Sequence, residues 1–119
     1  MDMRKQYASR DYWRGMLNAG VCKLLILRAV CDRPSHGYAI IRRVAALTHD
    51  VCVPTEVTVY PVLREFEACG CLTVRDDTVR GRTRHVYRAT PQGRAALRAG
   101  LVVWRHGLAK MSRALADTP

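Results

Sequence analysis

One short segment of this sequence carries side chains suited to binding phosphate. Arginines recur at every second position around Gly81, at Arg80, Arg82 and Arg84, and His85 follows directly. The segment is too polar to belong to a core, and alternate arginines at a hairpin tip suit a nucleic-acid backbone or a narrow minor groove. The alternative is an ordinary solvated loop.

The charge of the chain favours the same kind of partner. The 119 residues include 20 Lys and Arg against 10 Asp and Glu, a formal net charge of +10. Residues 78–116 hold basic side chains and no acidic one, so nearly all the excess lies there. We expect Arg88 to face DNA together with the arginines around Gly81. The remaining basic residues are expected to solubilise the outer face of a last helix: Arg94, Arg98, Arg105, Lys110 and Arg113. A strongly basic chain of this size has polyanions as its expected partner, nucleic acid before membrane.

The sequence offers little for a membrane, a metal or a catalytic site. The longest uninterrupted apolar run, 24–27, is too short to span a bilayer, and residues 1–14 contain no apolar signal. The five cysteines form no CxxC pair, the four histidines are scattered, and His49-x-x-Cys52 lacks further ligands. We therefore expect no catalytic residue, no metal, no cofactor and no membrane contact, with location in the cytoplasm at the nucleoid.

Apolar spacing predicts the elements that position these side chains. A helix is predicted over about 12–31, broken by Pro34, and Ser35 is the expected cap of a second helix with Ile40, Ile41, Val44 and Leu47 inside. A third helix should end at Gly70, with Val59, Leu63 and Phe66 inward. Its caps should be Thr55 and Thr58, and because of Pro61 its regular part should begin near Thr58 or bend there.

Two β-like segments, 71–75 and 85–89, follow around a turn, and Thr90-Pro91 opens a last helix. The predicted fold is α+β, mainly α: a winged helix-turn-helix with an added C-terminal dimerisation helix. Residues 1–11 form a basic N-terminal arm, residues 12–90 the DNA-binding domain, and residues 91–119 the dimerisation helix. The arm is expected to be a disordered tail or a second contact to DNA.

Specific motifs in this order resemble the PadR family of bacterial transcription regulators. The segments are Pro34-Ser35-His36-Gly37-Tyr38, Thr58-Val59-Tyr60-Pro61-Val62-Leu63-Arg64, Glu67-Ala68-Cys69-Gly70, Arg82-Thr83-Arg84-His85-Val86-Tyr87 and Ala89-Thr90-Pro91-Gln92-Gly93. The resemblance is to the short subclass with a single C-terminal helix, and it departs at Val57, where the family usually has glycine. It implies a DNA-binding regulator rather than an enzyme.

In a helix-turn-helix, one helix enters the major groove while neighbouring elements hold phosphates. The expected DNA-binding residues are Tyr38, Thr55, Thr58, Tyr60, Arg64, Arg80, Arg82, Arg84 and His85. For the two tyrosines the alternative is packing between helices, and for the threonines it is capping. For Arg64 the alternative is a solvated charge or a pair with Glu67.

The last helix carries an apolar seam that needs a partner. Leu97, Leu101, Trp104, Leu108, Met111 and Leu115 are spaced 4, 3, 4, 3 and 4 residues apart, as in a coiled coil. We expect a two-fold homodimer in which this seam meets its copy and the first helix, through Trp13, Met16 and Leu17. The alternative is that the seam folds back onto its own domain.

Multidrug-responsive members of the family resemble this layout, with paired tryptophans lining a pore at the dimer centre that stacks flat aromatic ligands. That resemblance implies an effector site at Trp104, with Leu101, Leu108 and Met16 as walls; the alternative is a tryptophan that only anchors the dimer. The predicted function is a repressor that binds a palindromic operator on double-stranded DNA as a homodimer and responds to a small planar aromatic effector. The competing hypothesis is a ligand-independent architectural or nucleoid DNA-binding protein.

Overall fold

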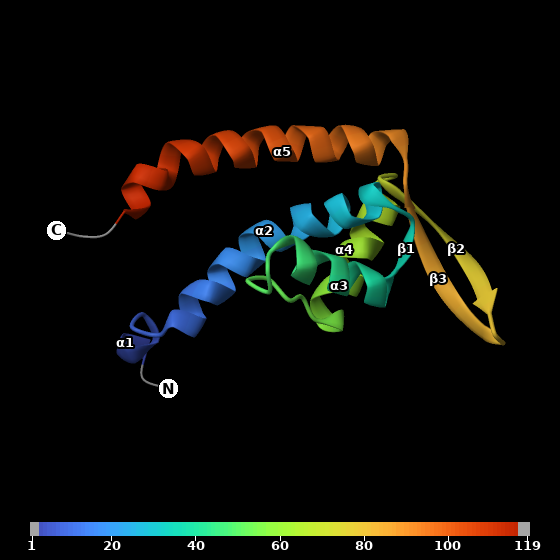
Figure 1. The fold of residues 1–119 in the computed structure, drawn as a ribbon, viewed down its shortest axis with the longest axis horizontal. Coiled ribbons are helices and arrows are strands. Elements are labelled where there is room, and N and C mark those ends of the chain that lie inside the picture. Colours follow the sequence, from blue (N-terminus) through green and yellow to red (C-terminus); the bar gives the residue numbers. More distant parts are fainter. Residues whose placement is uncertain (1–2, 117–119) are drawn as a thin grey trace.

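The computed structural model describes residues 3–116, which form a mainly helical fold with one small sheet at its end (Figure 1). The elements in chain order are α1 (Met3–Gln6), α2 (Arg10–Asp32), β1 (Ser35–His36), α3 (Gly37–Leu47), α4 (Glu56–Ala68), β2 (Leu72–Val79), β3 (Arg82–Ala89), α5 (Pro91–Met111) and a 3-10 helix, η1 (Ser112–Leu115). This confirms the winged helix-turn-helix with an added C-terminal helix. None of the helices in the described range is long and apolar enough to cross a membrane.

The core lies where α2, α3 and α4 meet. Each helix contributes a pair of side chains that are at most 1% exposed: Ile26 and Val30, Ile40 and Val44, Val59 and Leu63. Leu72 and Tyr87 add the base of the hairpin to the same cluster. Burying each large side chain contributes about 1.5–3 kcal/mol, so this contact holds the three helices in register.

The start of α3 differs from the prediction. Ser35 does not cap the helix, because Ser35 and His36 form β1, which pairs antiparallel with Tyr87 and Val86 of β3. The cap is His36, whose Nδ1 accepts a hydrogen bond from the Ala39 amide at 3.4 Å. A two-residue strand leaves no alternation in the sequence, so only the tertiary pairing reveals it.

The hairpin is longer than predicted. β2 and β3 pair along eight residues each, from Leu72 opposite Ala89 to Val79 opposite Arg82. Arg80 and Gly81 alone form the turn, and both have positive φ (53° and 77°), as a type I′ hairpin turn requires. Arg82, Arg84 and His85 therefore lie on a strand, which gives them fixed faces rather than a place in a loop.

Helix α4 begins at Glu56, two residues before the predicted start, and Pro61 lies inside it. Thr55 occupies the N-cap position, but its hydroxyl accepts no backbone amide. The predicted end is confirmed: Gly70 has φ 79°, and the Cys71 amide donates to the Phe66 carbonyl at 2.8 Å. This left-handed stop turns the chain directly into β2.

Helix α5 begins as predicted and then packs on α2. The Thr90 hydroxyl accepts the Gly93 amide at 3.0 Å and donates to the Gly70 carbonyl at 2.6 Å, which ties the start of α5 to the end of α4. Farther along, α5 and α2 diverge towards the chain ends (Figure 1).

The apolar seam of α5 consequently divides into two halves. Leu97 is 8% exposed and belongs to the core, which corrects its assignment to the dimer contact. Leu101 and Trp104 are half-buried. The other half is open: Leu108, Met111 and Leu115 are 45%, 52% and 74% exposed. The alternative of folding back thus applies to the first half of the seam alone.

The N-terminal segment is more ordered than a tail within the described range. α2 begins at Arg10, so the predicted arm 1–11 overlaps it by two residues, and Ser9 caps it by accepting the Tyr12 amide. The Trp13 indole donates to the Tyr7 carbonyl at 2.8 Å, and the Tyr7 and Tyr12 rings lie 5.2 Å apart. The outermost ends of the arm and of the 91–119 segment lie outside the described residues.

Candidate nucleic-acid interface

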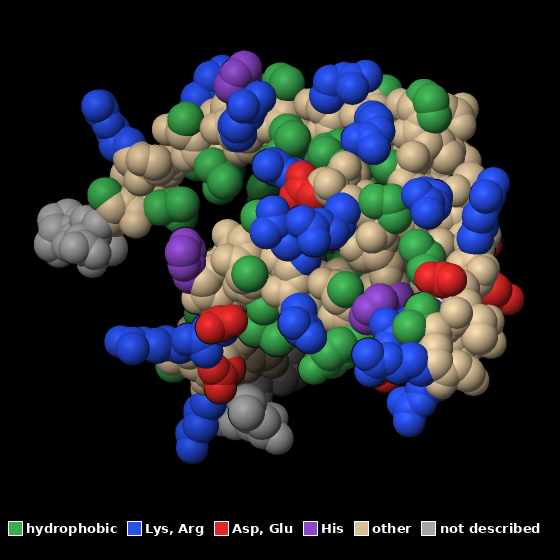
Figure 2. Space-filling view, turned by 45° about the vertical axis from the view of Figure 1, so that its right-hand side comes forward, with side chains coloured by type: hydrophobic (Ala, Val, Ile, Leu, Met, Phe, Trp, Pro, Cys, Tyr) green, Lys and Arg blue, Asp and Glu red, His purple; other side chains and the backbone are tan. Residues whose placement is uncertain are grey.

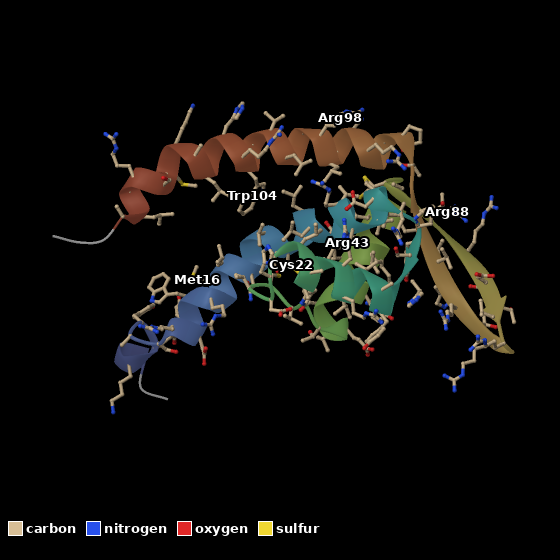
Figure 3. All side chains as sticks on the ribbon, in the orientation of Figure 1. Met16, Cys22, Arg43, Arg88, Arg98 and Trp104 are labelled. Atoms are coloured by element: carbon tan, nitrogen blue, oxygen red, sulfur yellow. The ribbon has the colours of Figure 1, made fainter. Side chains whose placement is uncertain are left out.

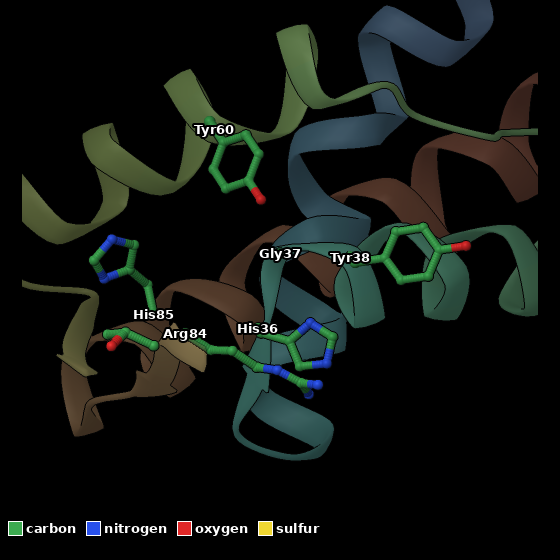
Figure 4. A pocket seen from close by; sticks show the side chains of 7 residues that line it. His36, Gly37, Tyr38, Tyr60, Arg84 and His85 are labelled. Atoms are coloured by element: carbon green, nitrogen blue, oxygen red, sulfur yellow. The ribbon is translucent and has the colours of Figure 1, made fainter. Parts of the chain in front are cut away.

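A groove of about 380 Å³ lies between the start of α3, the middle of α4 and strand β3. Four predicted DNA-binding residues line it: Tyr38, Tyr60, Arg84 and His85 (Figure 4). His36, Gly37 and Thr83 complete the lining. The fold thus brings side chains from three separate elements to one concave surface.

Tyr60 forms one wall of this groove by packing against α3. A Cβ at Gly37 would lie 2.5 Å from the Tyr60 hydroxyl oxygen and 2.7 Å from its Cζ, so the phenol covers bare backbone. Tyr60 is half-buried and packs against the core. The packing alternative therefore holds for Tyr60, which still lines the groove.

Tyr38 is placed differently. It is 58% exposed, and the Arg42 guanidinium lies 5.5 Å from its ring centroid. Core packing is therefore excluded for Tyr38. Its position in the first turn of α3, where backbone amides lack helical partners, is suited to a phosphate group.

The outer face of α4 carries the remaining predicted residues. The Thr55 and Thr58 hydroxyl oxygens lie 3.3 Å apart, and both side chains are exposed. Thr55 stands at the N-cap position of α4, but its hydroxyl makes no capping hydrogen bond to the helix backbone. Arg64 is exposed, and among the described residues no ion pair joins it to Glu67. These groups are available to base edges or phosphates.

The two faces of β3 have different charge. Arg82, Arg84 and Arg88 alternate along one face, and Thr83, His85 and Tyr87 lie on the other, which packs on the helices at its base. His85 is held by Asp76, its partner across the strands, with Nδ1 2.6 Å from the carboxylate oxygen. Because a carboxylate only accepts, Nδ1 is the donor, and this contact holds the His85 ring against β2.

Burial at the base of the wing affects Tyr87. Desolvation raises the pKa of its phenol above the ordinary value, and the nearby Tyr60 and Glu67 raise it further. Tyr87 is therefore neutral at physiological pH and acts as a packing residue beneath the groove.

A second basic surface was missed by the sequence reasoning. Arg33, Arg42 and Arg43 border an open hollow of about 530 Å³ on the outer face of α3, and His36 lines both this hollow and the groove. Asp32 compensates part of its charge through ion pairs with Arg43 (3.2 Å) and Arg28 (3.1 Å). The helical spacing of positions 39, 42, 43 and 46 is the signal that would have predicted this face.

Basic side chains also cover much of the visible surface beyond these two hollows, far more than acidic ones (Figure 2). One member of the block on α5 has a different role from the one predicted. Arg94 donates from Nη1 to the Cys31 carbonyl at 3.2 Å, so it caps the end of α2. Arg98 lies on the outer side of α5, away from α2, as predicted (Figure 3).

Trp104 points from α5 towards α2 (Figure 3), where a Cβ at Gly20 would lie 3.4 Å from its ring edge. The hollow beside it, about 280 Å³, is lined by Lys23, Leu24 and Phe66 among others. Of the four predicted ligand-binding residues, only Trp104 lines it; Met16 and Leu108 are exposed on the diverging parts of α2 and α5. Within one chain, the predicted pore is therefore not assembled.

Comparison with known proteins gives a consistent result. Residues 26–99 match the transcriptional regulator PadR-like family. The chain is 40% identical over 75 residues to the transcriptional regulator Rv3488 of Mycobacterium tuberculosis, a match that covers 63% of this chain and 67% of that protein.

Solved structures agree in fold. A transcriptional regulator from Clostridium thermocellum superposes with a TM-score of 0.75 at 21% identity, covering 84% of this chain and 98% of that one. A PadR family transcriptional regulator from Eggerthella lenta superposes with a TM-score of 0.72 at 25% identity, and the match covers 87% of this chain and 88% of that one. These structures confirm the expected fold. The family match confirms the expectation of a regulator rather than an enzyme. The chain belongs to the PadR-like family of DNA-binding transcriptional regulators.

Proposed function

We propose that this protein is a repressor that binds a palindromic operator as a homodimer. The observation that carries the proposal is the groove shared by Tyr38, Tyr60 and Arg84, with the exposed face of α4 beside it. α4 enters the major groove, where Arg64 contacts a guanine, and the N-terminus of α3 holds a phosphate. The arginines of the hairpin follow the backbone on the other side.

Dimerisation is supported by apolar side chains that the single chain leaves exposed. Trp13, Met16 and Leu17 of α2 are 53%, 55% and 51% exposed, and the outer half of the α5 seam is equally open. In Figure 2 the end of α5 projects from the body with hydrophobic side chains on its lower side. A two-fold pairing covers both faces at once and places two α4 helices on successive half-sites.

The effector site forms at the dimer centre in this proposal. Trp104 points from α5 towards α2, and Met16 and Leu108 are exposed on the diverging parts of the two helices. A second copy brings a second set of these side chains. A flat aromatic ligand between the two tryptophans changes the spacing of the two wings, and so selects one of two dimer states.

The proposal is tested with DNA from the protein's own upstream region. Footprinting should give a protected palindrome, sedimentation should give a dimer, and a reporter gene behind that region should be less active when the protein is present. Uniform coverage of all DNA would support the architectural alternative and refute a specific repressor. Trp104→Ala should abolish quenching of protein fluorescence by planar aromatic compounds and leave the dimer intact; monomers would make Trp104 an anchor rather than a ligand site.

A further inference from the structure

A further hollow lies on the opposite side of α2 from the exposed apolar face. It measures about 240 Å³ and lies between α2 and the segment that leads into α4. Gly15, Asn18 and Cys22 line it from α2, at the spacing of one helix face, and Cys52, Thr55 and Thr58 line it from the other side. Trp13, Met16 and Leu17 point the other way by the same periodicity, so dimerisation leaves this hollow open.

One polar atom at this hollow lacks a partner. Asn18 Oδ1 is buried and accepts no hydrogen bond, the one such atom among the described side chains of residues 5–116. A buried acceptor left unsatisfied costs about 1–3 kcal/mol, so native structures rarely keep one without a reason. A ligand that donates a hydrogen bond to Asn18 would recover this cost.

The lining also defines the charge of the ligand. Every residue around the hollow is uncharged, and burial together with the neighbouring Cys52 raises the pKa of Cys22 to about 12. The thiol is therefore neutral at physiological pH, and nothing here compensates an ionic group. An apolar cavity of about 150 Å³ accommodates a benzene ring, so about 240 Å³ accommodates a ring with one small polar substituent.

The segment that covers the hollow determines the position of the recognition helix. His49 and Asp50 both have positive φ (50° and 65°), a left-handed conformation that His and Asp adopt more readily than most residues with a side chain. The Thr48 hydroxyl holds the next turn by accepting the Cys52 amide at 3.0 Å and donating to the Val44 carbonyl of α3 at 3.0 Å. This segment ends at Thr55 and Thr58, whose hydroxyls stand at the rim of the hollow and on the exposed face of α4.

We propose that the hollow between α2 and residues 52–58 binds a small neutral molecule, a ring carrying an N–H or O–H donor for Asn18, and that its occupancy weakens DNA binding. The bound ligand forms hydrogen bonds to the hydroxyls of Thr55 and Thr58 from inside the hollow. These hydroxyls are then no longer free to bind DNA. Loss of one such hydrogen bond to a charged group corresponds to about a tenfold lower affinity. The effect on DNA rests on the proposed function; the binding itself does not.

Benzamide serves as the probe and toluene, which lacks the donor, as its comparator. Titration of the isotope-labelled full chain should give saturable NMR shifts with benzamide at the Asn18 side-chain amide and the Thr58 backbone amide. Toluene should bind more weakly at the same residues. Absence of saturable shifts there, or equal binding of toluene, would overturn the proposal.

Substitutions at Gly15 provide a matched pair, because a Cβ at this position meets nothing within 4 Å. Gly15→Leu should fill the hollow and abolish benzamide binding, whereas Gly15→Ala should retain it. Benzamide should lower the DNA affinity of the native chain and of Gly15→Ala, but not of Gly15→Leu. If the native chain binds DNA and benzamide without any effect of one on the other, the coupling is refuted. If the native chain binds benzamide but no DNA, the proposed function fails and the binding site stands.

Discussion

The phenol of Tyr60 lies directly against the backbone of Gly37, so that a Cβ on residue 37 would be 2.5 Å from the hydroxyl oxygen. This contact joins α4 to the first turn of α3, beside the groove that Arg84 borders. The shape of the interface thus depends on the absence of a side chain at one position.

Gly37→Ala should therefore destabilise the protein and widen the groove. Overpacking of this kind costs about 1–3 kcal/mol, measured as the free energy of unfolding in urea. Gly15→Ala is the matched control, since its Cβ has free space and a helical Gly→Ala change stabilises by up to about 1 kcal/mol. In a chain that already carries Tyr60→Ala, Gly37→Ala should cost close to nothing, because the phenol that the new Cβ would meet is gone. Equal stability of the two single variants would contradict the contact.

The wing should contribute to binding of all DNA sequences alike. Arg82→Ala with Arg84→Ala should weaken binding and flatten its dependence on salt by about one to two units of log–log slope. Arg98→Ala with Arg113→Ala removes the same charge from the outer side of α5 and from η1, and should leave the slope close to native. A native slope in the wing variant would remove the wing from the interface.

Arg94 should matter for stability rather than for DNA binding. Its bond to the Cys31 carbonyl caps α2, so Arg94→Ala should cost about 1 kcal/mol in free energy of unfolding. Arg98→Ala, one turn farther along α5, should cost close to nothing. The ranking would be wrong if the two variants unfolded at the same urea concentration.

The Cys22 thiol should make stability depend on alkaline pH. Burial and Cys52 raise its pKa from 9.0 to about 12, so the folded chain keeps a proton that the unfolded chain loses. Its contribution is complete below pH 9 and is lost as the pH rises from 9 to 12. The free energy of unfolding of Cys22→Ala should accordingly fall less steeply in that window; parallel curves for both proteins would contradict the assignment.

The helix faces and helix caps that follow from local sequence patterns could be predicted from the sequence. Elements that form only through contacts with distant parts of the chain could not. The inward positions Val59 and Leu63 and the cap Thr90 follow from local rules, and the structure has them as predicted. β1 could not be predicted, because two residues contain no pattern and only the edge of β3 selects them. Proline suggested a late start for α4, but the helix begins at Glu56 with Pro61 inside it.

The same limit applies to the candidate site. The residue types alone identified Tyr38, Tyr60 and Arg84 as members of the site. The hydrogen-bond partner of His85 depends on the strand register, and that of Arg94 depends on how α5 crosses the end of α2, so neither could be predicted. Leu97 shows the same limit: a heptad spacing states that a helix has an apolar side, and not which surface covers it.

Arg64 allows the most direct test of α4 as the helix that reads the bases. The affinity of Arg64→Ala is measured on the footprinted operator and on unrelated DNA of equal length, at one salt concentration. We expect a loss of about 1–3 kcal/mol on the operator, a small change on unrelated DNA, and hence relaxed specificity. An unchanged ratio of the two affinities would contradict this expectation.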